Sequence, residues 1–304
     1  MSKVVVLGSI NMDVVATASH HPEIGETIHG DSLSHFSGGK GSNQAVAAAR
    51  FNDSVHMYGS VGDDAAGQEL RRFLSDNNVD VDGVDIDATA PTGTAIIVVA
   101  GGDNTIVVVA GANEWPEPKD LSLLEAGDAV VAQFETPHEH TVSGFTHARE
   151  VGALTFLNPA PARAVSADLL DLVDYLVVNE TELRSLSSVD FTADDDGSVE
   201  QAVRSLLGQG IKVVVVTLGS SGLLAVQGDS SSGDVIRLDG HDVQAVDSTG
   251  AGDCFVGVLA ASVANGQPLS DALRIANAAA ALSVTKAGAG PSMPHPTEVE
   301  EFLA

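Results

Sequence analysis

Short aliphatic runs alternate with stretches of helical pattern along this chain, and no other feature constrains its fold as strongly. The runs lie at 4–7, 129–132, 154–157, 175–178 and 213–217. Continuous apolar runs of this length are typical of strands buried on both faces of a parallel sheet. Helical patterns lie between them, for example at 136–150 and 201–207. We therefore predict an α/β fold of three αβα layers, a doubly wound and mostly parallel sheet with helices on both faces.

Two regions interrupt this alternation, at about 13–37 and 92–109. The second contains a central Gly101-Gly102-Asp103-Asn104 turn, and both regions predict short antiparallel strands. Ligands of open α/β sheets bind beyond the carboxyl ends of the strands, where a small accessory sheet would act as a lid. The alternative is a pair of decorative hairpins. We expect one catalytic domain over 1–304, with a lid built from these two regions.

The charge of the chain is strongly unbalanced. It has 42 acidic and 14 basic side chains, and its formal net charge is −28. A nucleic-acid partner is not expected, because phosphate backbones are held by Lys/Arg patches. Disorder is not expected either, because 44% of the residues are hydrophobic. Multimolar salt would screen the self-repulsion by cutting the Debye length to about 3 Å or less, which indicates a salt-loving host.

The sequence gives no sign of a membrane segment. No apolar run reaches the roughly 18 to 20 residues that a membrane span needs, and the first residues have no signal-peptide layout. We expect a soluble, cytoplasmic protein without a membrane partner. Cys254 is the single cysteine, so an intramolecular disulfide and a thiolate zinc cluster are excluded. We expect a free, structural thiol.

A compact cluster of small residues stands at 247–255, in the sequence DSTGAGDCF. Gly250, Ala251 and Gly252 precede Asp253, between a strand-like segment at 241–246 and an apolar helix expected at 254–264. Backbone N–H groups at such a helix start converge on one point and favour an anion there. A carboxylate beside this point suits a base that takes the proton of a hydroxyl attacking a phosphoryl group. An ordinary helix cap would explain the acid but not the glycines.

Two better-known phosphate loops do not fit the sequence. No stretch matches G-x-x-x-x-G-K-[ST], because Lys40 is followed by Gly41. The loop at 247–255 also lacks the third glycine of G-x-G-x-x-G. Walker-type NTPases and dinucleotide-binding proteins are therefore disfavoured.

Further motifs occur in register along essentially the whole chain. They are GSINMD at 8–13, GGKGSNQA at 38–45, AGAN at 110–113, NPAPAR at 158–163, NETE at 179–182, TLGS at 217–220, the loop at 247–255, and GAGPS at 288–292. On these motifs the chain resembles the ribokinase family of sugar and nucleoside kinases. The resemblance implies a ribokinase-like fold and transfer of the γ-phosphate of ATP to the primary hydroxyl of D-ribose, giving ribose 5-phosphate.

The resemblance also implies roles for residues of the acceptor side. Asp253 would be the catalytic base, while the amides of Gly250, Ala251 and Gly252 hold the γ-phosphate. A purely positioning role for Asp253 is the alternative. The implied sugar contacts are Asn11, Asp13, Gly39, Lys40, Asn43, Glu135 and Asp253. Lys40 is one of only five lysines in this acidic chain, which weakens its interpretation as a surface lysine.

On the nucleotide side the resemblance implies a second set of residues. The ATP contacts would be Asn179, Thr217, Gly219, Ser220, Gly222, Gly252 and Asn277. Glu182 would join the Mg²⁺ shell through water, since Mg²⁺ tends to keep its waters; an ordinary helix cap is the competing interpretation of Asn179 and Glu182. A monovalent K⁺ ion would be held mostly by carbonyl oxygens of Asp247, Thr249, Ser283, Lys286, Gly288 and Ser292.

Some positions in the predicted lid depart from what the family pattern leads us to expect. They are His35 and the aliphatic run Val107-Val108-Val109. Another acceptor therefore stays open: ribose 1-phosphate, deoxyribose, a nucleoside, fructose or 2-keto-3-deoxygluconate. A non-catalytic sugar or nucleotide sensor is a further alternative, against which Asp253, Glu182 and the glycine loop argue. Because lids of related kinases pair and cover their sheet edges, the resemblance also implies a homodimer.

Overall fold

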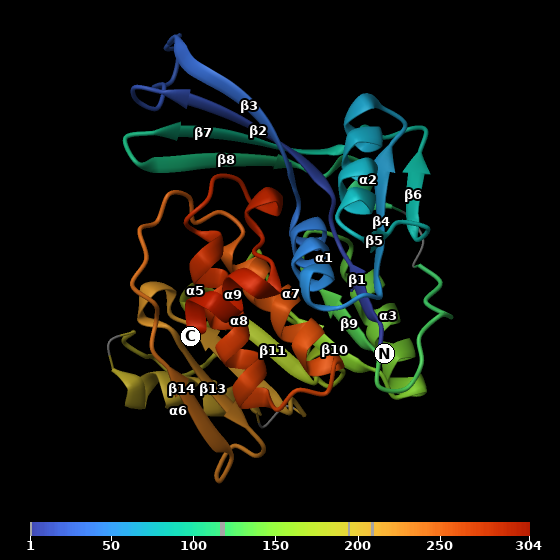
Figure 1. The fold of residues 1–304 in the computed structure, drawn as a ribbon, viewed down its shortest axis with the longest axis vertical. Coiled ribbons are helices and arrows are strands. Elements are labelled where there is room, and N and C mark those ends of the chain that lie inside the picture. Colours follow the sequence, from blue (N-terminus) through green and yellow to red (C-terminus); the bar gives the residue numbers. More distant parts are fainter. Residues whose placement is uncertain (1, 116–118, 194, 208–209) are drawn as a thin grey trace.

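A computed structural model describes residues 2–115, 119–193, 195–207 and 210–304. It has three layers, in which one main sheet lies between two layers of helices (Figure 1). In spatial order the strands of this sheet are β14 (Asp234–Leu238), β13 (Leu223–Gln227), β12 (Val213–Thr217), β11 (Tyr175–Asn179), β10 (Leu154–Leu157), β9 (Ala129–Ala132), β1 (Val4–Leu7), β4 (Val55–Gly62) and β5 (Val79–Asp80), with β6 (Val84–Asp87) paired to the second half of β4. The strands from β12 to β5 pair in parallel, whereas β13 and β14 form an antiparallel edge. The predicted mostly parallel sheet is confirmed.

Helices cover both faces of the main sheet. One face packs against α1 (Lys40–Phe51), α2 (Ala65–Asp76), α7 (Ala251–Ala264), α8 (Leu269–Ser283) and α9 (Pro296–Leu303). The other packs against α3 (His138–Val151), α4 (Ala167–Leu170), α5 (Glu180–Leu186) and α6 (Asp196–Leu207). Val4 and Val6 of β1 lie in the first core and Val5 in the second, as the alternation of a strand requires. Within the described ranges, no helix combines the length and apolar character needed to cross a bilayer.

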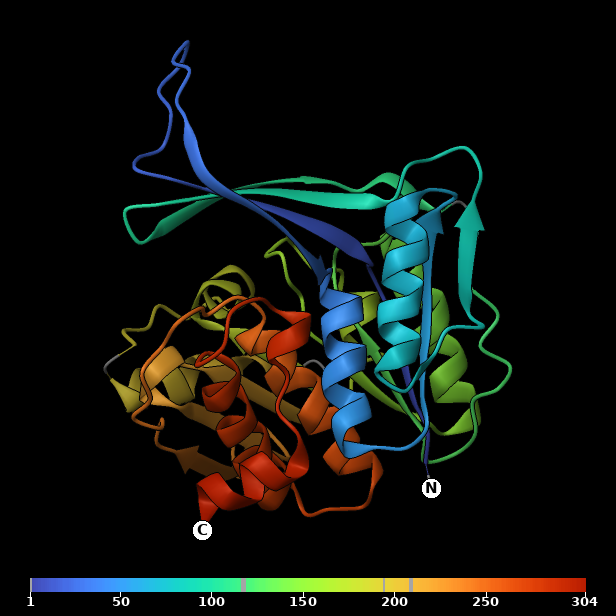
Figure 2. The ribbon, with the colours of Figure 1, turned by 45° about the horizontal axis from the view of Figure 1, so that its top comes forward.

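A separate small sheet stands over one end of this body (Figures 1 and 2). Its order is β3 (Gly30–Gly38), β2 (Asn11–Ala18), β7 (Gly93–Ala100) and β8 (Asp103–Val109). β2–β3 and β7–β8 are antiparallel hairpins, as predicted, but β2 and β7 pair in parallel. β2 and β7 are each the first strand of their hairpin. Both run outward from the main body, starting where Asn11 pairs with Gly93, so they lie parallel to each other.

β8, one of the two outer strands of the small sheet, is strongly exposed. Ile106, Val107, Val108 and Val109 of β8 keep between 48% and 61% of their surface exposed. Val107 and Val108 point to opposite faces because successive side chains alternate in a strand. β8 is therefore an aliphatic edge strand open on both faces.

The predicted strand at 241–246 is wrong, because the structure has an extended loop there. This segment leaves β14 at the edge of the main sheet and leads to α7, so it passes no strand with which to pair. It is held instead by Val284, whose carbonyl accepts from the backbone N–H groups of Val246 and Asp247 at 2.7 and 3.1 Å. α7 then begins at Ala251, three residues before the predicted start.

Candidate active site

A hollow of ≈ 180 Å³ lies at the carboxyl ends of β10, β11 and β12, beside the start of α7. Its lining residues are Lys40, Asn158, Ala160, Val177, Val178, Asn179, Glu182, Thr217, Ser248, Gly250, Ala251, Gly252, Asp253 and Val256. Ligands of open parallel sheets bind at this edge. The hollow brings together the glycine loop, the predicted base and part of the predicted nucleotide side.

Asp253 is buried in the first turn of α7, with 5% of its surface exposed. Its Oδ2 accepts from Asn43 Nδ2 at 3.0 Å, and its Oδ1 accepts from Gln44 Nε2 at 2.9 Å. A carboxylate has about four lone-pair sites, so both oxygens can accept further hydrogen bonds. The helix cap is Gly250, without a side-chain capping bond. Asp253 is thus not an ordinary cap, because its carboxylate bonds to α1.

The glycine loop leaves the start of α7 open toward the hollow. Gly250 has a left-handed φ of 79°, and a Cβ there would lie 2.7 Å from Ala289 Cβ, so a larger residue does not fit. A Cβ at Gly252 would meet nothing within 4 Å. The N-terminal N–H groups and dipole of α7, a helix of 14 residues, favour negative charge in this space. The arrangement suits a phosphate.

Four carboxylates gather around one lysine at this edge of the sheet. Burial, together with the negative charges of Glu135 and Asp253, raises the pKa of Asp13 to about 7. The negative charges of Asp253, Glu135 and Glu182 raise the pKa of Lys40, against the opposing effect of burial. Lys40 therefore stays cationic and offsets part of the repulsion among these acids.

The predicted sugar contacts converge beside Asp253. Asn11 and Asp13 lie on β2, and Glu135 accepts from Ser9 Oγ at 2.5 Å and from the Lys40 backbone N–H at 3.1 Å. Gly39 has a φ of 88°, and a Cβ there would lie 2.7 Å from the Asn11 nitrogen. A side chain at position 39 would therefore collide with the strand that carries Asn11.

Several amides of the site were not predicted. Asn113 accepts from the Ile10 backbone N–H at 2.9 Å and donates to Asn11 Oδ1 at 2.7 Å, which fixes the Asn11 amide. Gln44, Gln133 and Asn158 are also buried beside the hollow. The motifs contain Gln44, Asn113 and Asn158, but their partners are distant in sequence and no local pattern reveals them.

Asn179 and Glu182 form a capping box at the start of α5, so the competing interpretation of an ordinary cap has a structural basis. Asn179 Oδ1 accepts from the Glu182 N–H at 2.8 Å, and Glu182 Oε2 accepts from the Asn179 N–H at 2.9 Å. Both residues nevertheless line the hollow. Burial raises the pKa of Glu182, against the hydrogen bond from Asn179 and the charge of Lys40. Capping and a contact to a ligand are therefore compatible.

The remaining predicted ATP contacts lie at and beyond the end of β12. Thr217 is its last residue and lines the hollow. A Cβ at Gly222 would lie 2.1 Å from the Leu238 carbonyl oxygen, and Asn277 Nδ2 donates to the Asp239 carbonyl at 2.9 Å. Gly222 and Asn277 therefore flank the same segment. Together with Gly219 and Ser220 they are not among the residues that line the hollow.

The residues predicted to hold K⁺ lie in the loop before α7 and between the end of α8 and a short 3-10 helix at Gly290–Ser292, two segments that the structure joins. Asp247 accepts from the backbone N–H groups of Thr249 and Gly288, both at 2.9 Å. The hydroxyls of Ser283 and Ser292 donate to nearby carbonyls, and Lys286 Nζ pairs with Glu298 at 2.6 Å. The Lys286 side chain is thus directed to another partner, and the backbone carbonyls of the set are what a cation would use.

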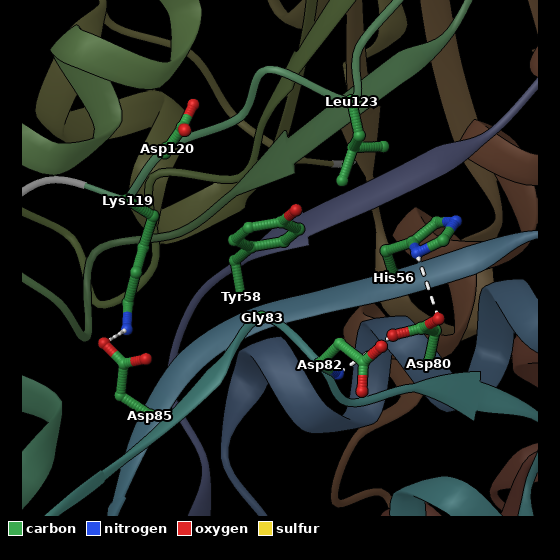
Figure 3. Close-up of a pocket in the computed structure, with 9 residues that line it drawn as sticks. All are labelled: His56, Tyr58, Asp80, Asp82, Gly83, Asp85, Lys119, Asp120 and Leu123. Atoms are coloured by element: carbon green, nitrogen blue, oxygen red, sulfur yellow. Dashed lines mark hydrogen bonds and ion pairs between the residues drawn. The ribbon is translucent and has the colours of Figure 1, made fainter.

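A larger hollow of ≈ 560 Å³ lies beside β4, β5 and β6 (Figure 3). It is lined by His56, Tyr58, Asp80, Asp82, Gly83, Asp85, Lys119, Asp120 and Leu123. Lys119 pairs with Asp85, and His56 Nδ1 lies 3.6 Å from Asp80 Oδ2. None of the predicted site residues lines it, so its larger volume does not make it the candidate active site.

Comparison with known proteins identifies the family. The model of the pfkB family of carbohydrate kinases matches residues 1–296. The chain belongs to this family. A ribokinase of Bacillus subtilis is 38% identical over the whole of both chains, and a deoxyribokinase of Salmonella typhi is 32% identical over 99% of this chain and 98% of its own. The Arabidopsis thaliana ribokinase structure, complexed with ribose and ATP, superposes with a TM-score of 0.90 at 33% identity, covering 100% of this chain and 99% of its own.

Membership of the pfkB family fixes the class of reaction. A carbohydrate kinase is a phosphotransferase with an alcohol group as acceptor, and this chain is an enzyme of that class. The fold agrees, because the solved ribokinases of Thermotoga maritima and Arabidopsis cover this chain completely. The hollow beside Asp253 is therefore the place in which to look for phosphoryl transfer.

The raised pKa of Asp13 gives a pH-dependent stability. This carboxyl has a pKa of about 7 in the folded protein and an ordinary value of 3.8. The folded state holds the proton more tightly, so stability falls as pH rises through this window and stays low above it. We expect Asp13→Asn to stabilise the sugar-free protein by up to about 4 kcal/mol at about pH 8, and by less as pH falls toward about 5. Thermal unfolding across this range measures the effect, and a difference that does not change with pH would contradict it.

Proposed function

We propose that this protein phosphorylates D-ribose with ATP, giving ribose 5-phosphate and ADP. The observation that carries the proposal is Asp253, a buried carboxylate held by two amides at the open start of α7. Full-length similarity to ribokinases and to a structure complexed with ribose and ATP supports the choice of both substrates.

The proposed reaction uses Asp253 as the base. Its carboxylate takes the proton of the primary hydroxyl while the hydroxyl oxygen forms a bond to the γ-phosphorus. The bond from this phosphorus to the bridging oxygen breaks, and ADP leaves with that electron pair. The N–H groups at Gly250, Ala251 and Gly252, with the dipole of α7, would stabilise the charge of the transferring group. With 5% of its surface exposed, Asp253 would be shielded from competing water once the substrates fill the hollow.

Sugar binding is proposed for Asn11, Asp13, Gly39, Lys40, Asn43 and Glu135. Asn43 Oδ1 is buried and has no hydrogen-bond partner among the residues that the structure describes, so a sugar hydroxyl would satisfy it. Hydroxyls of a polyol would also donate to the crowded carboxylates of Asp13 and Glu135. The small sheet would then act as a lid, because β2 carries Asn11 and Asp13 into it.

Mg²⁺ is proposed to be held near Glu182, with ATP along Asn179, Thr217, Gly219, Ser220, Gly222 and Asn277. The donor set fits, since Glu182 is a buried carboxylate that lines the hollow and Mg²⁺ accepts one carboxylate with several waters. When bound, Mg²⁺ would neutralise charge on the phosphates of ATP. Glu182 itself would stay oriented by Asn179 and Asn158.

Acceptors other than ribose remain alternatives, and a phosphorylated one would need a cation to receive it. His35 does not supply one in this structure, because it pairs with Val14 whereas Asp13 pairs with Phe36. Cross-strand partners share a face, so His35 and Asp13 point to opposite faces of the small sheet. Lys40 is a cation at the site, but Asp13, Glu135, Glu182 and Asp253 surround it, so the site favours a neutral sugar. The similarity to a deoxyribokinase keeps deoxyribose as the second candidate.

Asp253→Asn tests the function. We expect ADP formation from Mg-ATP in multimolar KCl to be fastest with D-ribose and to fall roughly 10² to 10⁴-fold in the variant, since it lacks the base. The matched control is Asp271→Asn, another acid in a first helix turn but exposed, which should leave kcat unchanged. Turnover only with deoxyribose, ribose 1-phosphate, fructose, 2-keto-3-deoxygluconate or a nucleoside would replace the acceptor. Binding of ribose without turnover of any acceptor would indicate a sensor instead.

A K⁺ site is proposed at Asp247, Thr249, Ser283, Lys286, Gly288 and Ser292. The contact between Gly250 and Ala289 joins these loops to the anion site, so a cation there would order the start of α7. Multimolar salt is also proposed as the working condition. The acidic side chains around Tyr58 in Figure 3 repel one another, and salt at that concentration would screen this repulsion.

Exchange of KCl for NaCl at equal ionic strength separates the two effects of salt. Screening of the net charge depends on ionic strength alone, so it is the same in both salts. We expect kcat to fall severalfold in NaCl, with only a small fall of the unfolding temperature from the loss of the bound K⁺. Equal kcat values in the two salts would contradict the K⁺ site.

A homodimer through the small sheet is also proposed. The exposed aliphatic side chains of β8 form an open edge strand, which proteins usually cover. We expect light scattering in multimolar KCl to give twice the chain mass of 31.0 kDa. A Val108→Lys variant should scatter as a monomer, and a wild-type monomer would contradict the dimer.

A further inference from the structure

A row of buried amide side chains, those of Gln133, Gln44 and Asn158, is hydrogen-bonded to Asp253 through Gln44. Gln44 lies on α1 and is fully buried. Its Nε2 donates to Asp253 Oδ1 at 2.9 Å and to Asn158 Oδ1 at 3.3 Å, which uses both of its hydrogens. Its Oε1 accepts from Nε2 of Gln133, which directly follows β9, at 2.6 Å. Gln44 thus links α1, the end of β9 and the end of β10 to the proposed base.

The polarity of this row is fixed by chemistry. An ionised carboxylate only accepts hydrogen bonds, so Gln44 must turn its NH₂ group toward Asp253 and its oxygen toward Gln133. Gln133 must then present its own NH₂ group. A Cβ at Gly8 would lie 2.1 Å from Gln133 Oε1, so the glycine leaves the space that the Gln133 side chain needs. The Gln44 amide is therefore held in one orientation.

The same amide also leads to the proposed Mg²⁺ residue. Asn158 accepts from Gln44 and donates through Nδ2 to the Val177 carbonyl at 3.1 Å and to Glu182 Oε2 at 3.4 Å. Asp253, Gln44, Asn158 and Glu182 thus form one buried hydrogen-bonded row. Its two ends are the carboxylates proposed for the two sides of the reaction.

We propose that Gln44 is a positioning residue for phosphoryl transfer, which orients the Asp253 carboxylate toward the acceptor hydroxyl and links it through Asn158 to Glu182. This inference rests on the proposed function, because it takes Asp253 as the base. A carboxylate free to rotate would spend less time in a geometry that can accept the hydroxyl proton. Gln44 would therefore act on kcat through Asp253 without touching either substrate.

A neutral amide is the side chain that this position requires. The charged groups around Asp253 are Lys40 from α1, Asp13 from β2, Glu135 after β9 and Glu182 from α5. A cationic side chain at position 44 would hydrogen-bond to Asp253, compete for its lone pairs and weaken it as a base. A carboxylate at position 44 would add repulsion to the crowded acids. Glutamine donates hydrogen bonds without either effect.

Gln44→Met tests the inference, because methionine keeps the length of the side chain but cannot donate. We expect kcat with ribose to fall on the order of 10 to 100-fold, while KM for ATP changes less than about twofold. Asn52→Ala is the matched control: Asn52 is a buried amide at the other end of α1, bonded to Ser2 and Asn265. It should lower the unfolding temperature without lowering kcat. An unchanged kcat in folded Gln44→Met would overturn the inference.

A double-mutant cycle with Asp253→Asn separates positioning from a general loss of structure. If Gln44 acts through Asp253, Gln44→Met should cost less than about twofold when added to Asp253→Asn, measured from the ribose 5-phosphate formed in long incubations. The same loss in both backgrounds would overturn the inference. Wild-type kcat in Asp253→Asn alone would instead overturn the proposed base.

Gln133→Met provides a second route if Gln44→Met does not fold. It leaves the donor to Asp253 in place but removes the partner that fixes the Gln44 oxygen. We expect a severalfold loss of kcat with KM for ATP unchanged. An unchanged kcat in folded Gln133→Met would overturn the inference in that case.

Discussion

The close packing of α1 on α7 is the contact on which the rest of the site depends. A Cβ at Gly257 would lie 2.3 Å from the Gln44 carbonyl oxygen and 2.7 Å from Ala47 Cβ, so any larger residue would force the helices apart. At this separation Asn43 and Gln44 reach both oxygens of Asp253. A buried carboxylate without such donors would be costly, so the close packing of α1 on α7 is also what makes a buried Asp253, the proposed base, energetically possible.

The site also holds more negative charge than its own residues neutralise. Lys40 is the cation among Asp13, Glu135, Glu182 and Asp253, and burial with its acidic neighbours raises the pKa of Asp13 to about 7. Hydroxyls that donate to these oxygens would relieve the repulsion, as would a divalent cation near Glu182. The protein without ligands is therefore less stable than its packing alone would allow, and a ligand that donates hydrogen bonds to these oxygens would recover part of that free energy.

Much of the fold could be predicted because buried parallel strands leave a strong local signal. The runs at 4–7 and 213–217 are apolar at nearly every position, and both are strands. β4 has no such signal, because His56, Tyr58 and Ser60 alternate with apolar residues beside the open edge of the sheet. The segment at 241–246 alternates in the same manner yet meets no neighbouring strand. The alternation of polar and apolar residues alone therefore cannot show whether a neighbouring strand is available for pairing.

The candidate site divides in the same way. Asp253 beside its glycine cluster is a local pattern from which a base can be predicted, whereas the roles expected of Asn179 and Glu182 follow only from the resemblance to the family. Gln44 and Asn113 act on partners more than 100 residues away, so only the fold reveals them. Residues of this kind orient other side chains through hydrogen bonds. The sequence shows that a glutamine or asparagine is present, but it does not show which distant residue that amide bonds to.

β2 connects the proposed sugar site with the small sheet. Its first residues, Asn11 and Asp13, stand beside Asp253, and its last residues lie in the middle of the small sheet between β3 and β7. A change that tilts this strand would alter the acceptor pocket and the outward surface of the small sheet together. Substitutions along β2 that change the proposed sugar preference would thus also change the surface proposed for the dimer.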